Sequence, residues 1–156
     1  FMKFDYVVMI YTMKINLGGE TEKDGWKIFN AQKKPGVDFV GNIEDLSQFK
    51  DESIKEIYAS HIIEHVDQKT INNTFNGIFR ILKKGGKFYV SVPDMDVLCH
   101  FFVSPLATKK VKFHIMTMIF GGQIDNFDYH YFGWNYEFMN DYLTFADFSK
   151  VEKLIH

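Results

Sequence analysis

The side chains with the clearest chemical potential stand together in the segment His61-Ile62-Ile63-Glu64-His65. The order H-x-x-E-H is that of inverted zinc peptidases, in which two histidines four residues apart share a helix face and the glutamate activates water. A third ligand would have to come from far downstream, for example Glu137. The segment directly follows a strand-like run, however, and the chain is small for a peptidase. We therefore expect no metal site, and we expect His65 to bond a backbone group near a helix start.

Glycines and polar residues mark the carboxyl ends of short apolar runs that have the length of buried strands. These runs are 14–17, 26–30, 37–40, 56–60, 87–92 and 149–154. The first five end at or just before Gly18-Gly19-Glu20, Asn30, Asn42-Ile43, Ser60-His61 and Val92-Pro93-Asp94.

Four helices are expected between and after these runs. The first has apolar residues on one face from 71 to 82, with Asp67 able to cap its start and the Lys-Lys-Gly-Gly run 83–86 ending it. Asp94 can cap a second helix over 95–103, and Ser104-Pro105 begins a third that ends at Gly121-Gly122. A fourth begins near Asn135. Strands alternating with helices predict an α/β fold with a mostly parallel sheet and helices on both faces. Ligands of such sheets bind beyond the carboxyl ends of the strands.

The composition of the chain excludes several classes of protein. A chain of 156 residues with 46% hydrophobic and 24% charged residues is an ordinary single globular domain, here residues 1–156, and not a disordered or collagen-like chain. A formal charge of −2 gives no global attraction to nucleic acid, and the single cysteine excludes a disulfide framework. Residues 1–13 are expected to form an N-terminal extension or extra strand, and they lack the features of a signal peptide. No segment has the length of a membrane span, so we expect no membrane partner and a cytoplasmic location.

The strand ends and the turns between them resemble the class I S-adenosylmethionine-dependent methyltransferases. The resembling motifs extend from Lys14 to about Leu154 and are Ile15–Gly19, Gly25-Trp26, Val37–Leu46, Glu56–His65, Arg80–Lys87, Ser91–Asp94 and Ala146–Phe148. The pair Ser-His and Glu-His, followed about twenty residues later by Leu-Lys-Lys-Gly-Gly, is the most specific of them. The resemblance implies the Rossmann-like class I fold and S-adenosyl-L-methionine as the cofactor.

The resemblance also assigns a role to each strand end. The turn Leu17, Gly18, Gly19 and Glu20 would pass the methionine moiety, and Asn30 would bind the ribose hydroxyls. Asn42 and Ile43 would contact adenine, while Ser60 and His61 would line the pocket between donor and acceptor.

The sequence also departs from the family pattern. Glu20 stands for a loop glycine, Asn30 and Asn42 stand for acids, and Asp147 stands for the glycine before the sixth strand. No sequence remains after His156 for the family's seventh strand, so we expect that strand to be missing. About nine residues separate the first two strands, so the helix that normally follows the glycine loop must be rudimentary. We expect these changes to weaken cofactor binding.

The aromatic segment 127–138 contains the second candidate catalytic histidine. His130 lies between Tyr129 and Tyr131, and it would act as the general base, with His61 near the acceptor. The alternative is a histidine that braces the segment through one backbone hydrogen bond. The aromatic residues themselves would form either a lid or an acceptor platform, or a core patch joining the last helix to the sheet. Lys109, Lys110 and Lys112 are expected to form a solvated helix face, with phosphate binding as the alternative.

Together these features predict a methyltransferase for a small-molecule or glycan acceptor. The alternative is a degenerate methyltransferase-like domain that binds a ligand without turnover. A homodimer that covers an exposed sheet edge is the expected assembly, because a lost edge strand leaves unpaired backbone groups.

Overall fold

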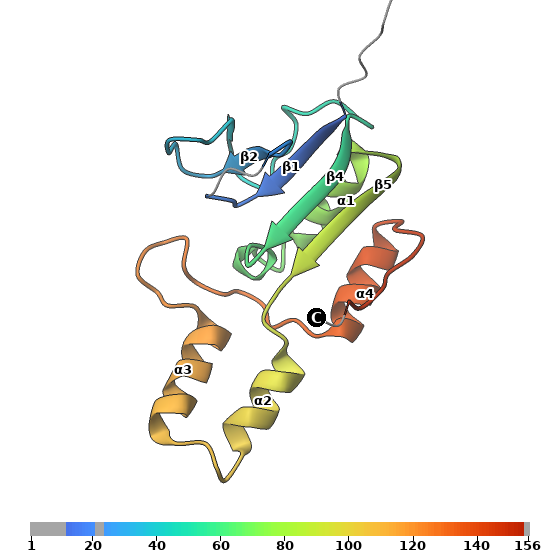
Figure 1. Cartoon of the computed structure of the whole chain (residues 1–156). Coiled ribbons are helices and arrows are strands. Elements are labelled where there is room, and N and C mark those ends of the chain that lie inside the picture. The colour runs from blue at the N-terminus through green and yellow to red at the C-terminus, as the bar shows by residue number, and fades with distance from the viewer. Residues whose placement is uncertain (1–11, 21–23, 155–156) are drawn as a thin grey trace, which may run out of the picture.

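The computed structural model describes residues 12–20 and 24–154 (Figure 1). Five parallel strands form one sheet in the order β3-β2-β1-β4-β5. Their bounds are Met13–Leu17 (β1), Lys27–Asn30 (β2), Phe39–Val40 (β3), Ile54–Ser60 (β4) and Leu82–Ser91 (β5). The expected strand at Tyr6–Tyr11 lies outside the described residues. The predicted Rossmann-like α/β class is confirmed.

Helices follow the fourth and fifth strands. A 3-10 turn, η1 (Ile63–His65), leads into α1 (Ile71–Ile81), which connects β4 to β5. After β5 come α2 (Met95–Val103), α3 (Lys109–Phe120) and α4 (Tyr136–Phe145). Figure 1 shows α2 and α3 as a hairpin that projects beyond the carboxyl ends of the strands, away from the sheet. None of the helices in the described part of the chain is long and apolar enough to cross a bilayer.

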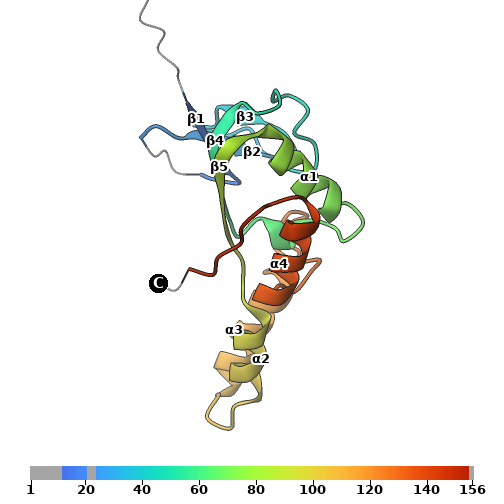
Figure 2. The ribbon, with the colours of Figure 1, turned by 90° about the vertical axis from the view of Figure 1, so that its right-hand side faces the viewer.

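One face of the sheet forms the core. Ile15, Leu17, Ile57 and Ala59 alternate along β1 and β4 and are buried, as a sheet with one covered face requires. Helices α1 and α4 lie on this side in Figure 2, and their buried residues belong to the same core.

The expectation of helices on both faces is corrected for the described residues. The opposite face carries Lys14, Glu56 and Tyr58, with an ion pair of 2.9 Å between the Lys14 Nζ and Glu56 Oε1 atoms. Trp26 lies on it, with its ring 6.3 Å from that of Tyr58. The cause is the short connections, because only nine residues separate β1 from β2 and eight separate β2 from β3. A parallel crossover with a helix needs about a dozen or more.

The first two expected helices are confirmed, with changes at the ends of α1. Thr70 precedes its first turn, while the Asp67 side chain accepts a hydrogen bond from the Lys69 N–H (2.8 Å) instead of capping the helix. The Lys-Lys-Gly-Gly run does not end the helix but lies within β5, where Gly85 has φ +72° at a bulge. Asp94 caps α2 as predicted, accepting from the Asp96 N–H at 3.0 Å.

The third helix begins later than expected. Thr108 caps α3 through a bond from the Val111 N–H to its Oγ1 (3.3 Å), whereas the Ser104 Oγ accepts from the Leu106 N–H within a turn. Ser104-Pro105 therefore lies at the tip of the hairpin, and Thr108 is the N-cap of the helix.

The fourth helix begins at its predicted cap, since the Asn135 Oδ1 accepts from the Phe138 N–H at 2.9 Å. It ends in a Schellman motif, in which Phe148 N donates to Leu143 O and Asp147 N to Thr144 O, both at 3.1 Å. Asp147 has φ +67°, which explains why the resembling family has glycine there.

The expected sixth strand at 149–154 is wrong. These residues have no regular secondary structure. The Phe148 ring instead packs on Phe79 and Phe88, with centroid distances of 5.3 and 5.8 Å, so the segment after α4 follows the core without joining the sheet.

Asp38 joins the two outermost strands on the β3 side. Its Oδ1 accepts from Lys27 Nζ (2.6 Å) and its Oδ2 from the Ile28 N–H (2.8 Å). Both bonds lower the pKa of the Asp38 carboxyl, the one from Lys27 more strongly.

We predict that Asp38→Asn lowers the free energy of unfolding at pH 7 by about 1 kcal/mol, because the amide keeps one neutral acceptor oxygen in place of two charged ones and these exposed bonds are partly screened by solvent. A group whose pKa is lowered by folding stabilises above its unfolded pKa, about 3.9, and this contribution is lost as the pH falls through the folded value. Urea titrations should therefore show a difference in the free energy of unfolding between the parent protein and Asp38→Asn that is smaller at pH 3 than at pH 7. The exposed Asp141→Asn variant is the control, and an equal deficit at both pH values would contradict the argument.

Candidate functional site

The predicted strand ends meet at the carboxyl edge of the sheet. Backbone bonds connect them in sequence across the sheet: Gly18 N to Phe29 O (2.8 Å), Gly41 N to Asn30 O (3.1 Å) and His61 N to Ser91 O (2.9 Å). The glycine turn, Asn30, Asn42 and Ser60-His61 therefore lie along one edge, as the sequence predicts.

The glycine turn is shaped by its own neighbours. Gly18 has φ +74°, and a Cβ at this position would lie 2.7 Å from Ile62 Cδ1. A Cβ at Gly19 would lie 2.3 Å from the Asn16 Nδ2. Glycine is thus required here by the protein itself. Leu17 is 1% exposed and part of the core, so only its backbone is available to a ligand.

Asn30 holds the glycine turn in place. Its Nδ2 donates to the carbonyl oxygens of Gly19 (3.1 Å) and Gly18 (3.5 Å), and its Oδ1 accepts from the Gln32 N–H (2.9 Å). A carboxylate has no hydrogen to donate to these carbonyls. The asparagine is therefore explained by the turn that it supports.

Asn42 has the same kind of local partner. Its Nδ2 donates to Glu44 Oε2 (2.9 Å), and its Oδ1 accepts from the Glu44 N–H (3.1 Å). The other carboxylate oxygen of Glu44 accepts from the Thr70 hydroxyl. Ile43 is 9% exposed and belongs mostly to the core. An aspartate at position 42 would face the Glu44 carboxylate and repel it.

Glu20 is exposed and forms an ion pair with Lys34, at 2.5 Å between Oε1 and Nζ. The Lys34 ammonium lowers the pKa of the Glu20 carboxyl. This partner reduces the repulsion that a ligand carboxylate near Glu20 would meet.

His61 begins the segment with H-x-x-E-H spacing in a left-handed conformation, with φ +52°. Its ring is largely exposed, and its Nδ1 lies 3.2 Å from Glu64 Oε1. His61 precedes η1, so it does not share a helix face with His65.

Glu64 is the buried acid of this region, with 1% of its surface exposed. Its Oε1 faces His61, and no hydrogen-bond partner for its Oε2 is found in the described structure. Burial raises the pKa of the Glu64 carboxyl. The Glu64 carbonyl accepts from the Tyr131 N–H at 2.8 Å, which holds the aromatic segment against η1.

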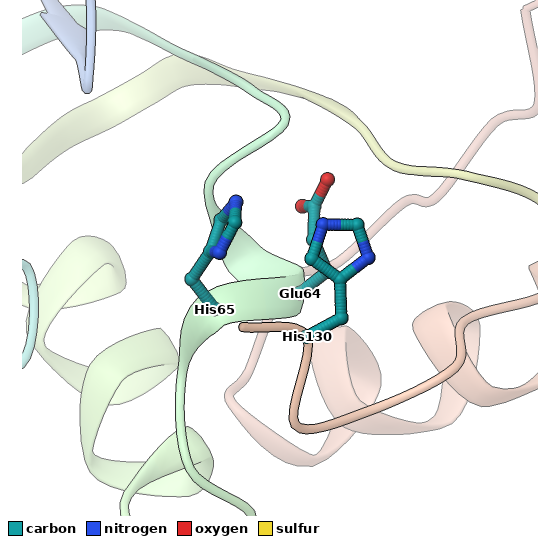
Figure 3. Close-up of side chains that lie close together, drawn as sticks. All are labelled: Glu64, His65 and His130. Atoms are coloured by element: carbon teal, nitrogen blue, oxygen red, sulfur yellow. The ribbon is translucent and has the colours of Figure 1, made fainter. Parts of the chain in front are cut away.

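His65 and His130 face Glu64 from two segments far apart in the sequence (Figure 3). The Nδ1 of His65 lies 3.1 Å from the Tyr129 carbonyl oxygen, and the Nδ1 of His130 lies 3.0 Å from that of Met118. The two rings are edge to face, with centroids 4.7 Å apart. Burial lowers the pKa of His130. The predicted backbone bond of His65 is confirmed. No pattern in the sequence predicts the contact between His65 and His130.

The arrangement of a zinc peptidase is not formed. Glu64, His65 and His130 are the three side chains that come together, each offering one ligand atom within 4.8 Å of the others. Glu137 lies exposed on α4 and is not among them.

The aromatic segment divides between the two expected roles. Trp134 is 1% exposed and contacts Phe75, Phe132 and Tyr142 in the core. Phe127, Tyr129 and Tyr131 are exposed. Of the three lysines on α3, Lys109 and Lys110 are exposed as expected, while the Lys112 ammonium lies 5.7 Å from the Phe102 ring centre.

The chain resembles methyltransferases in sequence and in structure. The family model "Methyltransferase domain" matches residues 18–90. No curated protein matches the sequence. An S-adenosylmethionine-dependent methyltransferase of Thermotoga maritima has a TM-score of 0.61 and 20% identity, covering 88% of this chain and 64% of its own.

Two further structures are similar. A chain in the complex between the Trm112 methyltransferase activator of Haloferax volcanii and a methyltransferase has a TM-score of 0.55 and 18% identity, with coverage of 87% and 61%. An O-methyltransferase family protein of Burkholderia thailandensis has a TM-score of 0.55 and 13% identity, and the match covers 96% of this chain and 50% of that protein. At these identities the likeness establishes the fold, and the chain spans less than two thirds of each of these proteins.

We predict that Asn30→Asp destabilises the protein by about 1–3 kcal/mol, because it places a carboxylate against the Gly18 and Gly19 carbonyls and removes their donor. It should also fail to tighten binding of S-adenosylhomocysteine, although aspartate is the family residue. Urea unfolding and calorimetric titration of the variant measure both effects. Gln32→Ala, which keeps the Gln32 N–H bond to Asn30, is the control. Tighter binding by Asn30→Asp would show that the side chain serves the ligand and not the turn.

Proposed function

We propose that this chain, which resembles the class I S-adenosylmethionine-dependent methyltransferases, transfers a methyl group to a hydroxyl or amine of a small-molecule or glycan acceptor. One observation carries the proposal. The glycine turn, Asn30, Asn42 and Ser60-His61 lie along the carboxyl edge of a sheet in the order β3-β2-β1-β4-β5, where ligands of such sheets bind. The family's cofactor is S-adenosylmethionine.

The residues at this edge fit the cofactor, with neutral groups in place of charged ones. The Oδ1 atoms of Asn30 and Asn42 each accept one local N–H bond, and a carbonyl oxygen has a second lone pair. Asn30 can thus accept from a ribose hydroxyl and Asn42 from the adenine amino group. Gly18 and Gly19 present backbone to the methionine moiety, and Ile43, Ser60 and His61 complete the set.

The bound cofactor supplies an electrophilic methyl group on a sulfonium, which an acceptor displaces in line. The chain's own contribution is mainly to position the two reactants. When the acceptor carries a proton, a histidine must remove it. His130 is neutral near pH 7 because burial lowers its pKa, and its Nδ1 is occupied by the Met118 carbonyl. Its Nε2 would take the proton, and His61, exposed beside Glu64, is the second candidate base.

A ligand-binding domain without turnover is the second candidate. It is favoured by the local engagement of both asparagines and by the absence of a helix after the described part of the glycine turn. The expected homodimer remains a proposal for the β5 edge, which pairs only with β4 in the described sheet.

We predict that S-adenosylhomocysteine binds with a dissociation constant in the tens of micromolar or weaker. At positions 30 and 42 neutral hydrogen bonds replace charge-assisted ones. This replacement costs about 2 kcal/mol of binding free energy, or roughly thirtyfold in affinity. Isothermal calorimetry and thermal shift measure this binding, and incubation with labelled S-adenosylmethionine and acceptor panels measures turnover. Binding without turnover supports the second candidate, and no heat or thermal shift at millimolar ligand would refute the enzyme proposal.

We predict that His130→Ala lowers turnover by roughly 10²–10⁴-fold while cofactor affinity stays within two- to threefold, as removal of a general base requires. If His130 is a brace, the same change lowers the melting temperature and weakens cofactor and acceptor together. His114→Ala, on the exposed face of α3, is the matched control. The kcat/KM profile against pH should lose its acidic limb in His130→Ala, a change that a structural role would not produce.

A further inference from the structure

We propose that Glu64, His65 and His130 form a binding site for one divalent cation of the zinc type. The three side chains come from η1 and from the segment before α4, and Figure 3 shows them facing one another. One ligand atom from each lies within 4.8 Å of the other two. The cation would occupy His130, which is named above as a candidate base, and the proposal replaces the expectation from sequence that this region holds no metal.

The backbone bonds of both histidines fix which ring nitrogen is available to a metal. A backbone carbonyl can only accept, so the Nδ1 atoms of His65 and His130 must carry the hydrogens that bond Tyr129 O and Met118 O. In a neutral imidazole the other nitrogen, Nε2, then carries the lone pair. Metal-binding histidines are commonly oriented in this way, by a bond from the other ring nitrogen to a backbone carbonyl.

The third ligand is the unsatisfied oxygen of Glu64. This side chain is 1% exposed, its Oε1 is bonded by His61, and its Oε2 has no partner in the described structure. Leaving a buried carboxylate oxygen without a partner is costly. A ring nitrogen of each histidine lies within 4.8 Å of a Glu64 carboxylate oxygen. A cation satisfies all three at once.

The donor set selects the cation. Two imidazole nitrogens and one carboxylate oxygen suit Zn²⁺ or Co²⁺, and they are a poor set for Mg²⁺ or Ca²⁺, which prefer oxygen ligands. Bond lengths of about 2.0–2.2 Å require the ligand atoms to close to roughly 3.3 Å in a tetrahedral site. Three protein ligands leave a fourth position for water or an acceptor oxygen. If a cation binds His130 Nε2, His61 is the remaining candidate base at this edge.

The test uses the full chain with Cys99→Ser, because Cys99 is an exposed thiol beside His100 that could bind metal by itself. The chelator-treated protein is titrated with Co²⁺, followed by its visible d–d absorption, and then with Zn²⁺ in competition. We expect one Co²⁺ per chain, displaced by Zn²⁺, and a higher melting temperature with Zn²⁺. Glu64→Gln and His65→Ala should each weaken binding at least tenfold, whereas His114→Ala should leave it unchanged.

Two outcomes would overturn the proposal: the parent protein gives no d–d absorption, or Glu64→Gln binds Co²⁺ as tightly as the parent. The second outcome would mean that Co²⁺ binds without the Glu64 carboxylate, outside the proposed site. Circular dichroism of each metal-free variant checks folding, and His65→Gln replaces any variant that does not fold. Titration with S-adenosylhomocysteine in the presence of chelator is a separate measurement, so failure of the metal site and failure of the proposed methyltransferase are distinguishable.

Discussion

The position of the candidate site depends on the burial of Trp134. Its ring packs against Phe75, Phe132 and Tyr142, and its carbonyl accepts from the Met95 N–H at 2.7 Å. The indole Nε1 has no partner in the described residues, which costs about 1–3 kcal/mol. Burial of about 150–250 Å² of a tryptophan side chain at about 25 cal/mol per Å² contributes about 4–6 kcal/mol, so burial prevails. The segment anchored in this way is the one that brings His130 to Glu64 and His65.

Local hydrogen bonds explain why this chain departs, at the strand ends, from the pattern of the family that it resembles. Asn30 and Asn42 both donate to oxygen atoms of the chain itself, a pair of carbonyls in one case and the Glu44 carboxylate in the other. The connections at this edge are short, with nine residues between β1 and β2 and eight between β2 and β3, and the two amides hold these loops. Ligand recognition and loop support therefore compete for the same side chains.

The sequence predicted the elements whose signals are local. The cap Asp94, the start of the fourth helix near Asn135 and the apolar runs of β1 and β4 are read from neighbouring residues, and the structure agrees. The errors arise where two local solutions compete. Thr108 prevailed over Ser104 as the cap of α3, and Gly85 formed a strand bulge instead of a helix end. The cluster of Glu64 with His130 was beyond prediction, because 66 positions separate them and contacts of the aromatic segment, such as the Tyr131 N–H bond to the Glu64 carbonyl, bring them together.

The placement of β1 at the centre of the sheet has a consequence for the order in which the chain assembles. Met13 pairs with Ile54, 41 positions later, and β4 in turn pairs with β5 across α1. Until residue 60 has left the ribosome, β1 has only the short strand β2 beside it, and its apolar side lacks α1 altogether. Pairings over such distances are slow to form because the intervening loop must close first. The nascent chain thus exposes an unfinished sheet until β4 and β5 have been synthesised, which is the period when a chaperone would be needed most.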